Sequence, residues 1–100
     1  MKAPFAFDHT VSFVELYDKL VELGPWTWRG TESDTYGDYL STNPDRRSWI
    51  KIFDRRDHWV VQLGALEGSS VTREQLERDL LDRILPAVGA RNLRETEPFY

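Results

Sequence analysis

The sequence has 100 residues and a formal net charge of −4, with 13 lysines and arginines against 17 aspartates and glutamates. This length suits a single domain, residues 1–100, with one modest core. Four Trp, four Tyr and five Phe residues argue against a disordered chain. The absence of cysteine excludes disulfides, thiolate nucleophiles and cysteine-bound zinc.

The first residues begin like a secretion signal, but Asp8 and His9 interrupt the apolar stretch before it reaches a useful length. No apolar run approaches the roughly 20 residues that a membrane span needs. We therefore expect a cytoplasmic protein with no membrane partner.

Residues 8–23 predict an amphipathic helix, because apolar residues recur at steps of three and four. Ser12 and Glu15 match a capping box near its start. Gly24 and Pro25 end it, since glycine permits the left-handed cap and proline prevents continuation. The polar side carries an acidic stripe: Glu15, Asp18 and Glu22. A solvated helix face explains this stripe better than a site for cations or a basic partner.

Two strands are predicted to follow the helix. Residues 26–31 alternate, with Trp26 and Trp28 facing inward. Residues 35–42 form a weaker strand, in which Gly37 marks a bulge or a close contact.

Residues 48–53 and 58–63 predict a β-hairpin, since both runs are short and rich in aromatic and β-branched residues. A loop with an even number of residues places Ile50 and Ile52 on the same face as Trp59, Val61 and Leu63. An odd loop would invert one strand and bring Trp49 and Phe53 there instead. We prefer the even loop because it makes one face wholly apolar.

The even loop gathers a second set of residues on the opposite face of the hairpin. We interpret this face as a candidate binding site for a protein partner, with Trp49 and Phe53 at least partly accessible. Coverage by residues 98–100 or by a second subunit, in a homodimer, is the open alternative. The candidate site residues are Trp49, Lys51, Phe53, Val60 and Gln62, with Arg55 and His58 at the end of the hairpin.

Residues 72–85 predict a second helix, which begins with a capping box formed by Thr72 and Gln75. Pro86 kinks or ends this helix, and Gly89 closes the turn. Residues 90–96 form at most a short edge strand. The predicted buried stripe of the helix consists of Leu76, Leu80, Leu81, Ile84 and Leu85.

This order of elements predicts an α+β fold in two layers. It runs helix, four-strand antiparallel meander, helix and a short edge strand at most, with both helices on one face of the sheet. The other face is then left to solvent or to a partner.

The sequence offers little support for catalysis. It has no Gly-x-Ser-x-Gly motif, and His9 and His58 share no metal-ligand spacing. Asp54, Asp57 and His58 gather at the hairpin turn, where turn chemistry explains them better than an acid–base or metal site. We therefore predict no catalytic residue, no metal site and no cofactor.

Our first functional hypothesis is a non-enzymatic protein-binding module, of the inhibitor or adaptor type, that uses the open sheet face. The second is a nucleic-acid-binding protein that uses the same face, because aromatic rings and nearby cations stack bases and contact phosphates. Aspartates among these cations, and the acidic net charge, favour the first hypothesis; a small-molecule enzyme is disfavoured. The cations are Arg46, Arg47, Lys51, Arg55 and Arg56.

Overall fold

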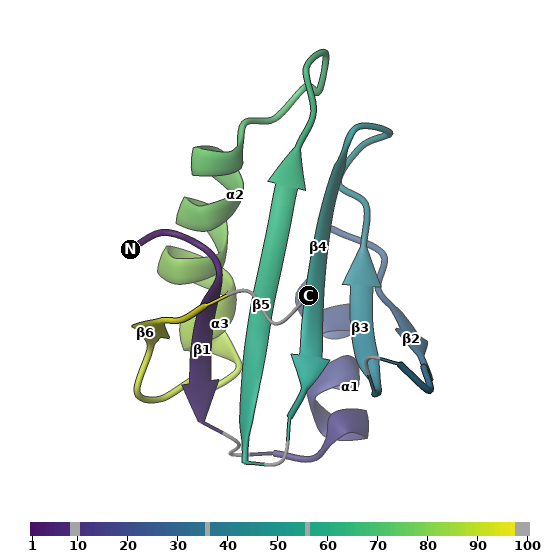
Figure 1. Ribbon diagram of the computed structural model, residues 1–100, viewed down its shortest axis with the longest axis vertical. Coiled ribbons are helices and arrows are strands. Elements are labelled where there is room, and N and C mark those ends of the chain that lie inside the picture. The colour runs from purple at the N-terminus through teal and green to yellow at the C-terminus, as the bar shows by residue number, and fades with distance from the viewer. Residues whose placement is uncertain (9–10, 36, 56, 98–100) are drawn as a thin grey trace.

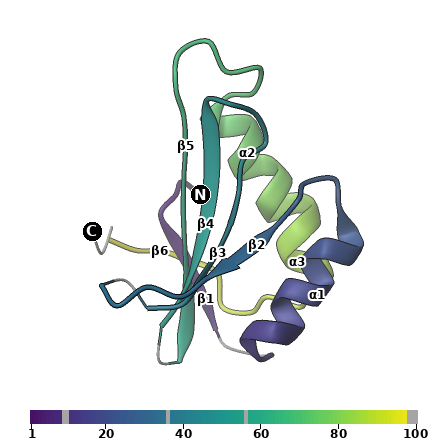
Figure 2. The same ribbon diagram turned by 90° about the vertical axis from the view of Figure 1, so that its right-hand side faces the viewer.

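The computed structural model describes residues 1–8, 11–35, 37–55 and 57–97. Six strands form one antiparallel sheet in the order β2-β3-β4-β5-β1-β6, and the helices lie on one face of it (Figures 1 and 2). The strands are β1 (Phe5–Asp8), β2 (Arg29–Thr31), β3 (Tyr39–Thr42), β4 (Ser48–Asp54), β5 (His58–Ala65) and β6 (Arg94–Glu95). The helical segments are α1 (Phe13–Leu23), α2 (Arg73–Asp79), the π-helical turn η1 (Leu80–Ile84) and α3 (Leu85–Ala87).

The expected α+β class with an antiparallel sheet is confirmed, but the predicted number of strands is wrong. The sequence interpretation missed β1, which pairs with β5 on one side and with β6 on the other. Residues 5–8 form this strand, so Asp8 belongs to it and not to the helix that was predicted for residues 8–23. As a result β5 lies inside the sheet and is not its edge.

The hairpin of β4 and β5 has the register that the even loop predicts. Ile50 pairs with Leu63, and Ile52 pairs with Val61. Together with Trp59, these side chains lie in the core between the sheet and the helices. Alternation therefore turns the intervening residues of both strands toward the opposite face.

α1 begins at Phe13, five residues after the predicted start. Its N-cap is Ser12, whose Oγ accepts a hydrogen bond of 3.2 Å from the backbone N–H of Glu15. At the other end Gly24 has a φ of 59°, and its N–H donates to the carbonyl of Leu20 at 3.2 Å. Leu16 and Leu20 are buried against the sheet.

The second helix begins with the predicted capping box: Thr72 Oγ1 accepts from the N–H of Gln75 at 3.1 Å, and Gln75 Oε1 accepts from the N–H of Thr72 at 2.8 Å. The helical path continues past Pro86 through α3. It does so after η1, where the N–H of Leu85 donates to the carbonyl of Leu80, five residues earlier. This wider turn lies where the proline ring would clash with a carbonyl of a regular α-helix.

Two side chains of α2, one buried and one exposed, hold the segment before β1. Glu77, which is 5% exposed, accepts a hydrogen bond from the N–H of Ala3 at 2.5 Å. Arg73 donates to the carbonyl of Ala3, and its Nε lies 3.6 Å from Glu77. These contacts attach the start of β1 to α2.

Asp45, in the turn between β3 and β4, connects that turn to the loop before α2. It accepts hydrogen bonds from the N–H of Arg47 at 2.9 Å, Ser48 Oγ at 2.8 Å and Ser69 Oγ at 2.9 Å. Ser70 donates two more, from its N–H at 2.6 Å and its Oγ at 2.8 Å. These donors, the Ser70 hydroxyl first, hold the pKa of the Asp45 carboxyl well below its usual range.

The core position of Leu63 can be tested against a matched leucine. Leu63 is 6% exposed, so Leu63→Ala should lower the free energy of unfolding by about 2–5 kcal/mol by leaving a cavity. Leu66, just beyond β5, is 55% exposed, and Leu66→Ala should change that free energy by less than about 0.5 kcal/mol. Urea unfolding followed by circular dichroism measures both. Equal losses would contradict the register of β5.

The role of Asp45 predicts a pH-dependent difference in stability. A carboxyl group whose pKa is lower in the folded chain than in the unfolded chain stabilises the fold at pH values above its unfolded-state pKa. This stabilisation is lost as the pH falls through the folded-state pKa. Asp45→Asn should therefore lower the melting temperature at pH 7, and the difference from wild type should shrink below about pH 4. Asp82→Asn, on the exposed side of η1, is the control and should melt like wild type at pH 7. A difference for Asp45→Asn that stays constant into acid would rule out its charge as the cause.

Candidate binding face

Among the described residues no helix covers the face of the sheet that points away from α1 and α2 (Figure 2). We call it the open face. Cross-strand partners point the same way, so the register defines rows of side chains across it. One row, which lies across β2 to β5, is polar: Arg29, Ser41, Lys51 and Gln62. The adjacent row is more apolar and reaches β6: Thr31, Tyr39, Phe53, Val60, Ala6 and Arg94.

The structure places the residues of the predicted site on the open face or at its end. Trp49, Lys51, Phe53, Val60 and Gln62 alternate with the core residues of β4 and β5. His58 begins β5, and the N–H of Arg55 donates to the carbonyl of His58 at 3.0 Å across the turn. The role of this set in binding stays a prediction.

Phe53 is not accessible, which corrects one expectation. It is 1% exposed, and Val60 beside it is 4% exposed. The ring of Tyr39 packs against Phe53 with 5.1 Å between ring centroids, and Ala6 of β1 lies next to Val60. The sequence interpretation lacked β1. It therefore placed Phe53 and Val60 nearer to the edge of the sheet than the structure does. The proposed cover by residues 98–100 lies outside the described residues.

Trp49 is half-buried and lies on its cross-strand partner Gly64. A Cβ added to Gly64 would lie 2.3 Å from Cζ2 of the indole and 2.6 Å from Cη2. Glycine is therefore required at position 64 because the ring occupies the space of a side chain. The contact fixes the indole against the backbone of β5 and leaves part of it accessible.

Lys51 and Gln62 lie beside this ring in the polar row. Lys51 Nζ lies 5.6 Å from the ring centroid of Tyr39, a cation–π contact. Gln62 Oε1 is inaccessible to solvent and has no hydrogen-bond partner among the described residues. Arg29 Nη2, at the end of the row, donates to Asn43 Oδ1 at 2.6 Å. The row thus places two cations on the open face, with Lys51 close to the rings of Trp49 and Tyr39.

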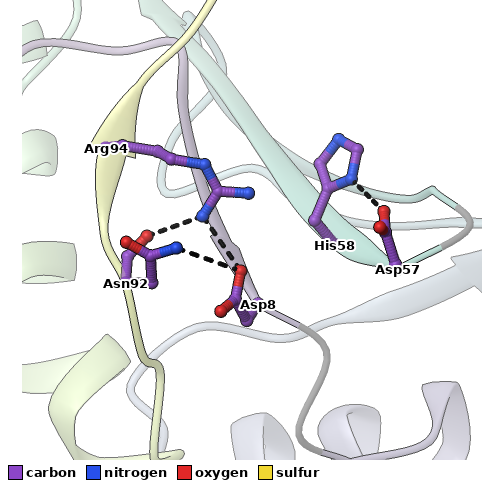
Figure 3. A network of polar contacts seen from close by, with 5 residues as sticks. All are labelled: Asp8, Asp57, His58, Asn92 and Arg94. Carbon is purple, nitrogen blue, oxygen red and sulfur yellow. Dashed lines mark hydrogen bonds and ion pairs between the residues drawn. The ribbon is translucent and has the colours of Figure 1, made fainter.

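A polar network lies at the end of the open face where β5 begins (Figure 3). Arg94 donates to Asp8 Oδ1 at 3.0 Å and to the carbonyl of Asn92 at 2.7 Å, which joins β6 to β1. His58 Nδ1 lies 2.8 Å from Asp57 Oδ1. The hydrogen bond from His58 lowers the pKa of the Asp57 carboxyl.

The two parts of the network have separate structural roles: Arg94 and Asp8 join β6 to β1, whereas the contact between Asp57 and His58 lies within the hairpin. Asp57 orients the imidazole of His58, but both side chains lie on the surface at the turn. Among the described residues no group of three His, Asp or Glu side chains is arranged to hold a metal ion.

The four described basic residues of the alternative hypothesis do not form one patch. Arg46 and Arg47 lie before β4, and Arg47 Nη1 donates to the carbonyl of Glu67 at 3.3 Å. Arg55 lies at the far end of the same strand, and Arg56 is outside the described residues. Of the four that the structure describes, only Lys51 lies in the middle of the open face.

Sequence reasoning missed several residues of the open face. Arg29 had a signal, because it alternates with the inward residues Trp26 and Trp28. Tyr39 and Ser41 lie in a strand whose register the sequence left open. Asp8 and Arg94 belong to β1 and β6, whose pairing depends on contacts between the two ends of the chain.

Comparison with models of known protein families, with curated proteins and with solved structures finds no match for this chain. None of the helices in the described part of the chain has the length and apolar character that a membrane crossing requires.

The contact between Trp49 and Gly64 can be tested by a double-mutant cycle. Gly64→Ala should lower the free energy of unfolding by about 1–3 kcal/mol, because the added methyl displaces the indole. In the Trp49→Ala background the same change should cost nothing, since alanine is normally better than glycine in a strand. Urea unfolding of the four proteins measures the coupling. Equal costs in both backgrounds would show that the ring does not lie on Gly64.

Proposed function

We propose that this chain is a non-enzymatic protein-binding module, of the inhibitor or adaptor type, and that the open face is its contact surface. The observation that carries the proposal is the half-buried indole of Trp49, held on Gly64 beside Lys51. A ring fixed in this way loses little conformational freedom when a partner covers it. Aromatic anchors of this kind, with a cation nearby, contribute most of the binding energy in many interfaces.

The polar row indicates the chemistry of the partner. Lys51 and Arg29 place two positive charges along one line of the sheet, on either side of Ser41. We therefore propose a protein surface that covers Trp49 with an apolar side chain and places carboxylates near the two cations.

A protein partner fits these charges better than a nucleic acid. The arginines that would extend a phosphate-binding surface lie at opposite ends of β4, and the chain as a whole has a net charge of −4. Asp8 and Asp57 add negative charge at the end of the open face. A nucleic-acid interface would need a continuous basic stripe.

The proposal can be tested by site-specific crosslinking in the host cell. A photo-reactive amino acid in place of Gln62 should capture one protein, whereas the same group in place of the exposed Asp82 on η1 should not. With that protein purified, Trp49→Ala should weaken binding by about 30-fold, the effect of a hot-spot residue worth about 2 kcal/mol. Trp26→Ala, which changes a half-buried tryptophan on the helix side, is the matched control.

Charge reversal provides the second arm of this test. Lys51→Glu should weaken binding at least tenfold, and Lys19→Glu on α1 should leave it unchanged while making the same change in net charge. Melting temperatures of all variants check that folding is intact. Capture of nucleic acid, with an affinity that falls steeply with salt, would replace this proposal with the alternative. Capture of a second copy, with a dimer in sedimentation, would make the open face a homodimer interface.

A further inference from the structure

β2 is the terminal strand of the sheet in the described part of the chain, and its outer edge has one backbone position that is ready to pair with another strand. In an antiparallel ladder, successive residues bond alternately to the two neighbouring strands. The N–H of Asp54 in β4 donates to the carbonyl of Asp38 at 2.9 Å, so Asp38 bonds toward β4. Tyr39 and Ser41, which alternate with β4-bonded positions, therefore bond toward β2.

This hydrogen-bonding pattern determines which way the backbone N–H and carbonyl of Gly30 point. Arg29 pairs with Ser41 and Thr31 pairs with Tyr39, so both use their backbone groups on β3. The N–H and carbonyl of Gly30 consequently point away from the sheet. Because β2 is the terminal strand, these two groups lie at the edge of the sheet (Figure 1).

An apolar groove of about 160 Å³ lies beside Gly30, between β2 and α1. Phe13, Val14 and Tyr17 line it from α1, and Gly30 lines it from β2. A Cβ on Gly30 would lie 3.4 Å from the Phe13 ring, so the absence of a side chain opens this space. A strand added beside β2 would point the residue opposite Gly30 into this groove, because cross-strand partners share a face.

The surface of α1 around the groove is more apolar than its packing requires. Val14 is 65% exposed and Val21 is 49% exposed, although Leu16 and Leu20 already cover the core. With 3.6 residues per turn, Val14 and Val21 lie on the flank of α1 that continues from Phe13 and Tyr17. Exposed apolar area that is continuous with a groove is typical of an interaction surface.

The rim of the groove is acidic. Asp18 and Glu22 follow Val14 around α1, and both are exposed. Glu32 directly follows β2, is exposed, and by alternation lies on the same face as Gly30. Lys19 lies further round the helix, past these acidic residues. The groove therefore favours an apolar side chain whose neighbours on the same face are basic.

We propose that the edge of β2 binds an extended segment of a partner protein by β-strand addition, with an apolar residue in the groove and lysine or arginine two residues away on each side. Backbone bonds to Gly30 provide the pairing, and the groove and its acidic rim provide the side-chain preference. This edge site is distinct from the open face, so it stands or falls independently of the proposed function.

A synthetic peptide tests the proposal with the full chain. The probe has nine residues, with isoleucine at the centre, lysine two residues away on each side and threonine elsewhere. Binding should slow hydrogen exchange at the Gly30 amide, which NMR measures directly, and should shift the signals of Val14. Peptides with alanine at the centre, or with glutamate in place of lysine, should bind at least tenfold more weakly.

Two variants of equal charge separate the groove from general electrostatic attraction. Val14→Lys should weaken binding of the lysine peptide at least tenfold, whereas Leu66→Lys, at another exposed apolar position, should change it less than twofold. Equal weakening by both variants, or binding without protection of the Gly30 amide, would overturn the proposal. A dimer of the chain without peptide would also overturn the proposal if it protected the Gly30 amide and was lost in Val14→Lys. A second copy of the chain would then occupy the edge.

Discussion

The pairing of β4 with β5 is the constraint on which the rest of the structure depends. Ile50 opposite Leu63 and Ile52 opposite Val61 give the sheet one apolar face, and the helices pack on that face. A slip of one residue would turn these side chains to solvent and bring Lys51 or Gln62 into the core. The same register places Trp49 on Gly64, so the core and the candidate binding face result from one choice of pairing.

The elements that the sequence predicted well are those whose signals are local. The hairpin has two short runs of β-branched and aromatic residues, and α2 has a capping box at Thr72 and Gln75 that the structure contains. β1 was missed because Phe5 to Asp8 is only four residues long and pairs with a strand far along the sequence. The path through Pro86 was left open for a similar reason: whether a helix ends at a proline or widens into a π-helical turn depends on packing around it.

The candidate sites show the same division between local and non-local information. Alternation in β4 and β5 was enough to place Trp49, Lys51 and Gln62 on one face. Arg29 alternates with inward residues, but its place beside Ser41 and Lys51 followed only from the pairing of β2 with β3. The burial of Phe53 followed only from Tyr39 and β1. The groove beside Gly30 combines α1 with a strand edge, and no periodicity within either segment shows that they meet.

The position of β1 between β5 and β6 also affects how the chain is made. Ribosomes release the chain from its start, so Phe5 and Phe7 emerge before the strand that covers them has been synthesised. Ala6 also pairs with Arg94 of β6. This part of the sheet can therefore form completely only when nearly the whole described chain is available. The hairpin of β4 and β5, by contrast, can form as soon as its own residues are free, because its contacts are close in sequence. During synthesis the N-terminal aromatic residues therefore remain uncovered for longest, and a nascent chain halted before β5 would expose them to chaperones and proteases.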